Sequence, residues 1–300
     1  MESKTRACPK CGALNGVGFS RCIRCSEPLG AVGAGVSVLK SRLDPKQLWG
    51  AKVLVTITVL VFVGQLASML SCGTLNGLMS GGNNAQLRQF GAMLISAEHT
   101  LAEPYRLVSA VFVHIGVLHI VMNMLTFVNA ARVVEPGVGT ARFVLAYVAC
   151  GVAGFGVNIA FDALFPARSI VLTAGASGAV FGVMGMVIGW LLQMRDKRWR
   201  SYAGQAVFFA VIVNLMGFSI NNGAHIGGLI TGAVLGFVFA KYPQPKQPLL
   251  ANIGAAAAIV LVLVSLFLAQ RSADFGKNAC LRSLVDAAQH NRRLEFFGHI

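Results

Sequence analysis

The sequence predicts an all-α protein that crosses a membrane several times. Of its 300 residues, 55% are hydrophobic and only 12% are charged, whereas soluble domains carry about 25% charged residues. The apolar residues gather into stretches of about 20, the length that a helix needs to cross a bilayer. The net charge of +14 comes from basic residues that lie between these stretches and form no single patch. We therefore expect the charge to orient the chain in a membrane, and we expect no nucleic-acid partner.

The first 30 residues are polar, and we expect them to form a small separate module. Their four cysteines follow the spacing C-x2-C-x10-C-x2-C, at Cys8, Cys11, Cys22 and Cys25. Two close pairs of thiolates suit a tetrahedral structural Zn2+ ion, as in a zinc ribbon. Two disulfides or redox pairs are the alternatives, and a reducing cytoplasmic location disfavours both. Because such a module cannot bury enough core alone, zinc would supply folding energy, and the module would serve to recruit an unidentified cytoplasmic partner or a substrate.

Seven apolar segments follow a linker over residues 31–51, and each is predicted to be a membrane-spanning helix. Their predicted bounds are 52–72, 107–129, 142–162, 170–192, 203–220, 224–240 and 251–269. The first six make a predicted core over residues 52–241. The seventh lies in the segment 249–269 and is followed by a tail over residues 270–300.

Counts of lysine and arginine predict that the N-terminus lies in the cytoplasm. Nine basic residues precede or begin the first span, and a second basic cluster follows the fourth span over residues 195–200. The loops of the opposite side carry only three basic residues. The tail does not fit this distribution, because seven spans place its five basic residues on the outer side of the membrane. The strongly apolar run from Ile259 to Leu268 nevertheless favours a seventh span.

A serine and a histidine lie inside two of the apolar segments, where polar groups are costly and usually functional. Ser177 stands about seven residues, or roughly 10 Å, into the fourth span, and His225 opens the sixth. Both spans run inward from the outer face, so both side chains are expected in the outer half of the membrane. For Ser177 alone, a hydrogen bond to its own helix is the simpler interpretation. Together the two residues suggest a nucleophile and its general base.

Glycines predict how these two residues meet. They recur at steps of three and four, at positions 178, 182, 185 and 189 of the fourth span and at positions 228, 232 and 236 of the sixth. Small residues at such steps let transmembrane helices approach closely. We therefore expect the fourth and sixth spans to pack together and to bring the imidazole within hydrogen-bond reach of the hydroxyl.

The second span supplies three further polar residues, His114, His119 and Asn123. His119 and Asn123 are four residues apart and share one helix face. Donors to a developing oxyanion are the first interpretation, a structural polar network is the second and a metal site is a distant third. No carboxylate completes a triad, because Asp162 ends the third span and Glu135 is expected in a cytoplasmic-side loop. A Ser–His dyad is the simpler hypothesis, with an aromatic side chain that the sequence does not identify holding the imidazole.

These residues resemble the motifs of the rhomboid intramembrane serine proteases over about residues 52–241. The resemblance rests on five motifs in order: Tyr105-Arg106, His114-x4-His119-x3-Asn123, Glu135 with Gly137 and Gly139, Gly175-Ala-Ser177-Gly178, and Ala224-His225-x2-Gly228. The family commonly has Trp-Arg where this chain has Tyr105-Arg106. A seventh span resembles the extended form found in part of the family.

The resemblance implies a role for each motif residue. Ser177 would be the nucleophile and His225 the general base, without a catalytic cofactor. His119, Asn123 and the Ser177 backbone N–H would shape the oxyanion hole. Gly175 would help to form the turn before the serine, and His114 would have a structural or water-organising role.

The function expected from these observations is that of a serine endopeptidase that cleaves transmembrane segments of single-pass or other membrane proteins. The alternative is a catalytically silent protein that binds membrane clients in the same groove. The expected location is the bacterial cytoplasmic membrane, as a multi-pass protein. Cys72, Cys150 and Cys280 are interpreted as packing residues and not as metal ligands.

Overall fold

The structure is a computed structural model in which the chain forms two compact units, Met1–Leu48 and Trp49–Ile300. It describes residues 5–8, 14–16, 21–22, 24–26, 29, 48–73, 77–79, 84–165, 171–215, 222–242 and 249–272. In the first unit, β1 (Thr5–Ala7) pairs antiparallel with β2 (Leu14–Gly16). Cys8 follows β1 directly and is buried together with Cys22 and Leu29.

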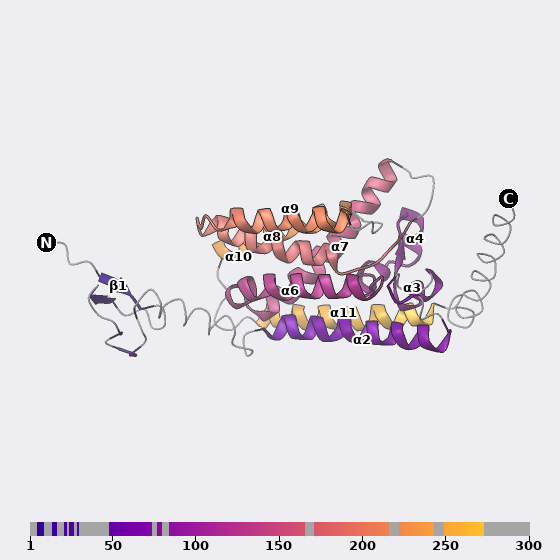
Figure 1. The fold of residues 1–300 in the computed structure, drawn as a ribbon, viewed down its shortest axis with the longest axis horizontal. Helices are drawn as coiled ribbons and strands as arrows, with labels where there is room; N and C mark the ends of the chain where they lie inside the picture. Colours follow the sequence, from indigo (N-terminus) through magenta and orange to yellow (C-terminus); the bar gives the residue numbers. More distant parts are fainter. Residues whose placement is uncertain are drawn as a thin grey trace. The chain divides into compact units, whose positions relative to one another are not determined.

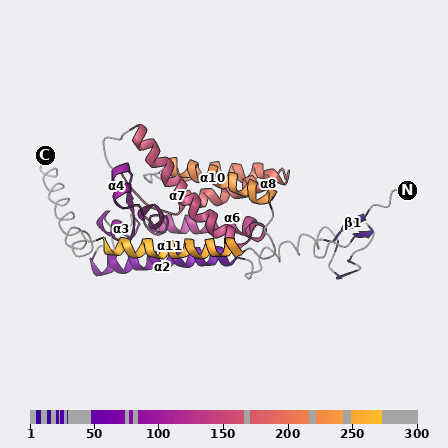
Figure 2. The same ribbon diagram turned by 180° about the vertical axis from the view of Figure 1, so that it is seen from behind.

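The second unit is a bundle of long helices joined by short elements at one end (Figures 1 and 2). Its elements are α2 (Trp49–Ser71), α3 (Asn84–Phe90), β3 (Met93–Leu94), α4 (Ala97–Ala102), α5 (Arg106–Ser109), α6 (Val117–Val138), α7 (Thr140–Leu164), β4 (Leu172–Thr173), α8 (Ser177–Gln193), α9 (Trp199–Leu215), α10 (Asn222–Lys241) and α11 (Leu249–Arg271). Helix α7 contacts α2, α6, α8, α10 and α11 and so lies at the centre of the bundle.

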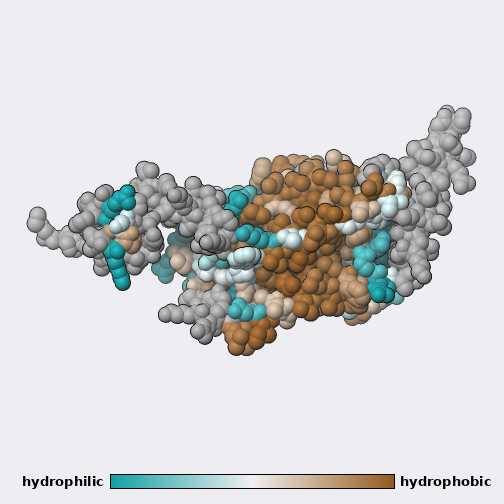
Figure 3. Space-filling model, turned by 90° about the horizontal axis from the view of Figure 1, so that it is seen from below, coloured by the Kyte–Doolittle hydropathy of each residue, from teal (hydrophilic) through white to brown (hydrophobic). Residues whose placement is uncertain are grey.

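On the face that Figure 3 shows, the bundle is apolar around its middle and more polar towards its two ends. Large apolar side chains such as Leu60 on α2 and Phe267 on α11 are 64% and 57% exposed. Among the described residues, five helices (α2, α6, α7, α10 and α11) are long and apolar enough to cross a membrane, and α8 is a shorter apolar helix of 17 residues. The prediction of an all-α polytopic membrane protein is thus confirmed, with α8 and α9 shorter than the predicted fourth and fifth spans.

The second predicted span began ten residues too early. Residues 106–109 form the separate short helix α5, and α6 begins only at Val117. Gly116, which precedes α6, has a φ of +85°, and a Cβ there would meet the Met79 carbonyl oxygen at 2.0 Å. Hydropathy does not distinguish this buried non-helical turn from the helix after it, so His114 lies before α6 and not within a span.

The fourth predicted span also began too early, because α8 starts at Ser177 itself. Leu172 and Thr173, which the prediction placed inside the helix, form the strand β4 and pair antiparallel with β3. Gly175 has a φ of +133°, a value that a helix cannot continue through. Ser177 is therefore at the N-terminus of its helix and not about seven residues inside it.

Glu135 lies inside α6 and not in a loop as predicted. Its buried carboxylate accepts hydrogen bonds from the backbone N–H groups of Gly50 (2.7 Å) and Ala51 (3.0 Å), in the first turn of α2. The first N–H groups of a helix lack intrahelical partners, and a negative charge is favourable there. Glu135 thus fixes the start of α2 against α6.

Cys72 and Cys150 are both buried, as predicted. Cys150 in α7 is a free thiol. Cys72, which follows α2, is disulfide-bonded, which the sequence did not indicate. Cys280 lies outside the described residues.

Candidate active site

The nucleophile and base predicted from the sequence are in direct contact. Ser177 is the first residue of α8, and His225 lies in the first turn of α10. The Ser177 Oγ and the His225 Nε2 are 2.9 Å apart, which is a hydrogen-bond distance. Each polar residue lies in the first turn of its helix, so the two N-termini bring the side chains together at one end of the helix pair.

The glycines of α8 and α10 make this approach feasible. A Cβ on Gly228 would lie 1.9 Å from the Gly178 carbonyl oxygen, and one on Gly232 would lie 1.8 Å from the Gly182 carbonyl oxygen. No side chain larger than hydrogen fits at those distances. The prediction that complementary glycine faces pack the fourth and sixth spans together is confirmed.

The imidazole of His225 stacks on Phe181, with ring centroids 4.4 Å apart and an interplanar angle of 18°. Phe181 lies four residues after Ser177 in α8, so the two side chains share one face of the helix. Among the described residues, the His225 Nδ1 has no hydrogen-bond partner. Sequence reasoning expected an aromatic support without identifying it, although the four-residue spacing from Ser177 was a usable signal.

The loop before Ser177 is held by hydrogen bonds to its backbone. Gly175 N–H donates to the Ala110 carbonyl oxygen (2.9 Å), and Ala176 N–H donates to the His114 Nε2 (3.4 Å). The His114 Nδ1 lies 3.4 Å from the Phe112 carbonyl oxygen. Both contacts fit a single neutral tautomer with the proton on Nδ1. Of the two roles expected for His114, the geometry supports the structural one.

His114 is in turn fixed to α2. The Gln65 Nε2 donates to the His114 carbonyl oxygen (3.0 Å), and the His114 N–H donates to the Gln65 Oε1 (3.2 Å). Sequence reasoning missed Gln65, which is buried in an otherwise apolar span. A polar residue within such a span was a signal that could have identified it.

His119 lies beside the same loop, and Asn123 follows it one turn later in α6. A Cβ on Gly175 would meet the His119 ring, with Cε1 at 2.6 Å and Nε2 at 3.0 Å, so the missing side chain leaves room for the imidazole. The Asn123 Nδ2 donates one hydrogen bond to the His119 carbonyl oxygen (3.0 Å). An amide nitrogen has two protons, so a second one remains for another acceptor. The structure thus places the His119 ring against Gly175, two residues before Ser177, and the buried Asn123 side chain against the backbone of His119.

A cavity of about 540 Å³ opens at the start of α10. It is lined mainly by apolar residues from the end of α7, the β4 strand and the start of α10, and these include Val157, Phe161, Leu172 and Ile226. Ile226 directly follows the histidine. The cavity is large enough for apolar side chains of a bound polypeptide.

Three of the four cysteines of the N-terminal unit form a cluster. The Sγ atoms of Cys8, Cys22 and Cys25 all lie within 4.8 Å of one another, and those of Cys8 and Cys25 are 3.6 Å apart. All three residues are thiols outside any disulfide, and Cys8 and Cys22 are buried. Such a group of thiols could hold a metal ion, whereas Cys11 lies outside the described residues.

Comparison with known proteins gives one consistent match. A family model described as Rhomboid domain matches residues 101–242. The chain is 34% identical to RHOMBOID-like protein 6, mitochondrial, of Arabidopsis thaliana over 55% of its own length and 53% of that protein. It is 33% identical to Rhomboid protease GluP of Bacillus subtilis over 62% of its own length and 35% of that protein.

A shorter relative is matched over more of its length. The chain is 30% identical to Putative rhomboid protease YdcA of Bacillus subtilis, over 48% of its own length and 71% of that protein. The chain thus spans about half or less of the two longer relatives and most of the shorter one. The matched region includes Ser177, His225 and the three polar residues His114, His119 and Asn123, whereas Gln65 precedes it.

Proposed function

Because the chain belongs to the rhomboid family of intramembrane proteases, we propose that it is a serine endopeptidase that cleaves membrane-embedded segments of other membrane proteins. The observation that carries the proposal is the 2.9 Å contact between the Ser177 Oγ and the His225 Nε2 at the paired starts of α8 and α10. A serine hydroxyl is a weak nucleophile until an adjacent base accepts its proton. The contact supports this activation by His225.

The proposed reaction has two steps. In the first, the Ser177 Oγ attacks the carbonyl carbon of the scissile bond as its proton moves to the His225 Nε2, which then protonates the leaving amine. The product is an ester between the substrate acyl group and Ser177. In the second, His225 takes a proton from water, the water oxygen attacks the ester, and the proton returns to the Ser177 Oγ as the acid leaves.

The oxyanion that forms in each step needs hydrogen-bond donors. The Ser177 N–H lies at the N-terminus of α8, where backbone N–H groups are free of intrahelical partners. We assign the other donors to His119 and Asn123, because the His119 ring lies against Gly175 and the Asn123 amide has a second proton. Loss of one such donor typically raises the barrier by about 2.7–4 kcal/mol.

The imidazole is oriented without a carboxylate in this proposal. Stacking on Phe181 fixes the plane of the His225 ring and directs its Nε2 at the serine. Aromatic contacts of this kind contribute about 0.5–1.5 kcal/mol beyond burial.

Fluorophosphonate labelling of the purified protein in detergent tests the proposal. Wild type should be labelled, whereas Ser177→Ala and His225→Ala should not be. Ser201→Ala serves as the matched control, because Ser201 is an exposed residue of α9, and it should be labelled like wild type. A folded wild type that resists labelling would favour the second candidate, a client-binding protein that uses the 540 Å³ cavity for recognition alone.

We also propose that residues 1–48 face the cytoplasm of a bacterial cell. The lysine and arginine distribution supports this orientation. The disulfide-bonded Cys72, at the far end of α2, supports it as well. Disulfides persist in oxidising compartments and not in the cytoplasm. Labelling of single-cysteine variants with a membrane-impermeant maleimide in intact cells should reach position 72 and not position 22.

We propose further that the N-terminal unit holds a structural Zn2+ ion. The cluster of Cys8, Cys22 and Cys25 supplies three thiolate ligands, and the Arg24 N–H donates to the Cys22 Sγ (3.4 Å). A hydrogen bond to a ligand sulfur orients it towards the metal. The sequence spacing assigns the fourth ligand to Cys11, and zinc sites of this type are tetrahedral.

Metal analysis tests the zinc proposal without an activity assay. The purified protein should contain about one zinc per chain, and Co2+ substitution should give the absorption bands of a tetrahedral thiolate site. Cys22→Ser should lose both, whereas Cys150→Ser should keep both because that thiol is buried in α7. A metal-free wild type with oxidised N-terminal thiols would contradict the proposal.

A further inference from the structure

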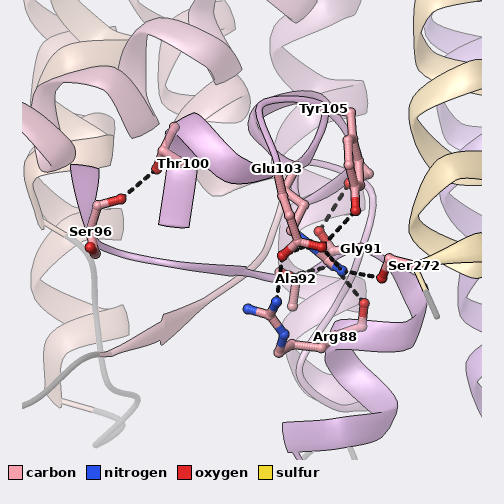
Figure 4. Close-up of polar contacts among 10 residues, drawn as sticks. Arg88, Gly91, Ala92, Ser96, Thr100, Glu103, Tyr105 and Ser272 are labelled. Carbon is pink, nitrogen blue, oxygen red and sulfur yellow. Dashed lines mark hydrogen bonds and ion pairs between the residues drawn. The ribbon is translucent and has the colours of Figure 1, made fainter. Parts of the chain in front are cut away.

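We propose that the end of α11 positions the nucleophile, with Ser272 acting through Arg106 and the loop before Ser177. This inference rests on the proposed protease function, and Ser272 is a positioning residue that touches no reacting atom. The evidence is a series of hydrogen bonds that leads from α11 to Gly175. Figure 4 shows the contacts at the α11 end of this series, around Ser272, Glu103 and Ala92.

The first step joins α11 to α5. The Arg106 Nη2 donates to the Ser272 Oγ (2.8 Å), across 166 residues of sequence. Ser272 directly follows α11, and its backbone N–H donates to the Leu268 carbonyl oxygen (2.9 Å). The serine hydroxyl therefore moves with the last turn of α11.

The second step concerns the Arg106 guanidinium, which is almost fully buried, with 2% of the residue exposed. Its Nη1 donates to the carbonyl oxygens of Arg88 (2.7 Å) and Ala92 (3.0 Å), and its Nη2 also donates to the Glu103 Oε1 (3.0 Å). Its Nε is 2.9 Å from the Glu103 Oε2. Because burial of a charge is costly unless the charge is paired and hydrogen-bonded, each of these contacts restrains the position of the guanidinium. Among these acceptors, the hydroxyl of Ser272 is the one that lies at the end of α11.

The third step leads from Arg106 to the nucleophile. Arg106 begins α5, a single turn that ends at Ala110, whose N–H donates to the Arg106 carbonyl oxygen (3.0 Å). The Ala110 carbonyl oxygen accepts the hydrogen bond from Gly175 N–H (2.9 Å), two residues before Ser177. A shift of α5 would therefore move the turn that sets the direction of the Ser177 side chain.

Two contacts make α5 rigid enough to transmit such a shift. The Ser109 Oγ donates to the Gly91 carbonyl oxygen (3.0 Å), and the position of a Cβ on Gly91 would be 2.6 Å from that side chain. The α5 turn thus packs without a gap against the loop that Arg106 also binds. Small displacements in active sites cost large factors in rate, because the reacting atoms must be held in a narrow geometry.

The test measures how fast a fluorophosphonate labels Ser177 in the full-length protein. Removal of the hydroxyl in Ser272→Ala should lower the labelling rate about threefold to tenfold, a usual range for coupling through a packed network. The maximal inactivation rate should fall while the apparent affinity for the probe stays unchanged. Ser272→Thr, which keeps a hydroxyl, should restore the rate.

The matched control lies in the same helix. The Ser265 Oγ is buried and has no hydrogen-bond partner among the described residues, so Ser265→Ala removes a hydroxyl from α11 without breaking the connection. It should be labelled at the wild-type rate. A double variant adds a second check: in an Arg106→Lys background, Ser272→Ala should cause no further loss. If Arg106→Lys does not fold, Glu103→Gln takes its place, because that carboxylate shares the Nη2 of Arg106 with Ser272.

Three results would overturn the inference. These are a wild-type labelling rate for Ser272→Ala, an equal loss for Ser265→Ala, or independent effects of Ser272 and Arg106. Failure of wild type itself to be labelled would instead contradict the proposed protease function, so the two failures are distinguishable.

Discussion

At the residue scale, the site depends on side chains that hold the two reacting groups in place. Phe181 lies against His225, His114 holds the Ala176 N–H, and Gln65 fixes His114 from α2. None of these three residues takes part in the proposed bond changes. They are buried or packed between helices, so their effect is to restrict the geometry of Ser177 and His225.

Phe181 gives the first prediction. Phe181→Leu should reduce the fluorophosphonate labelling rate about twofold to tenfold, because loss of the stacked ring removes about 0.5–1.5 kcal/mol of orienting contact. Phe181→Tyr should retain most of the rate. The control is Phe208→Leu, because the Phe208 side chain is 67% exposed on α9. A wild-type rate for Phe181→Leu would exclude the orienting role.

Glu103 gives a prediction about pH. Partial burial by itself raises the pKa of this carboxyl, but the hydrogen bonds from Arg106 and Tyr105 and the charges of Arg106 and Arg88 outweigh it and lower the pKa from 4.5 to about 2. A carboxyl whose pKa is lower in the folded state stabilises the protein at pH values above its pKa in the unfolded chain. This stabilisation is lost as the pH falls from about 4.5 through 2.

The measurement is the thermal unfolding midpoint in detergent as a function of pH. Wild type should be more stable than Glu103→Gln at neutral pH, and the difference should shrink as the pH falls below about 4.5. Glu98→Gln is the control, because Glu98 is an exposed residue of α4, and its curve should run parallel to that of wild type. A constant difference for Glu103→Gln down to the lowest pH would contradict the role of the ionised carboxylate.

At the element scale, the main contact is the packing of α8 against α10 through their glycines. The carbonyl groups of one helix lie where the side chains of the other would be. Helices packed this closely gain dispersion contacts along their whole length. The starts of both helices, and with them Ser177 and His225, are fixed by the same contact.

Gly232 tests this packing. Gly232→Ala places a methyl group 1.8 Å from the Gly182 carbonyl oxygen, and overpacking of this kind typically costs about 1–3 kcal/mol. We expect a lower thermal unfolding midpoint and slower labelling. Gly204→Ala in α9, where a Cβ would meet no atom within 4 Å, should have neither effect. Equal unfolding midpoints and equal labelling rates for the two variants would mean that α8 and α10 can move apart without a loss of stability or of labelling.

At the scale of the whole molecule, the chain divides into a cysteine-containing unit over Met1–Leu48 and a helical unit over Trp49–Ile300. Every residue of the proposed active site belongs to the second unit. A finer division of the chain remains a prediction. It consists of a module over residues 1–30, a linker over 31–51, a core over 52–241, an added helix over 249–269 and a tail over 270–300.

The separation of the two units predicts that metal and catalysis are independent. Removal of the proposed zinc ion with a strong chelator should expose the thiols of Cys8, Cys22 and Cys25 to alkylation, since thiolates released from a metal are reactive. The rate of fluorophosphonate labelling at Ser177 should stay within about twofold of the untreated protein, because the two sites belong to different compact units. A large loss of labelling after chelation would show that the first unit supports the second.

The sequence by itself determined the membrane class, the presence of a long helix in each apolar segment, and the pairing of Ser177 with His225. It could do so because hydropathy and glycine periodicity are local properties, and because a polar residue in an apolar span is visible without a structure. The resemblance to rhomboid proteases rested on the same local motifs.

Only the tertiary structure decided where the helices begin and which distant residues meet. The start of α8 at Ser177 follows from the backbone of Gly175 and from β4 pairing with β3, which hydropathy does not record. The contacts of Glu135 with the start of α2 and of Ser272 with Arg106 join residues 84 to 166 positions apart. Such pairings depend on the packing of whole helices, because no local pattern specifies which buried donor will face which acceptor.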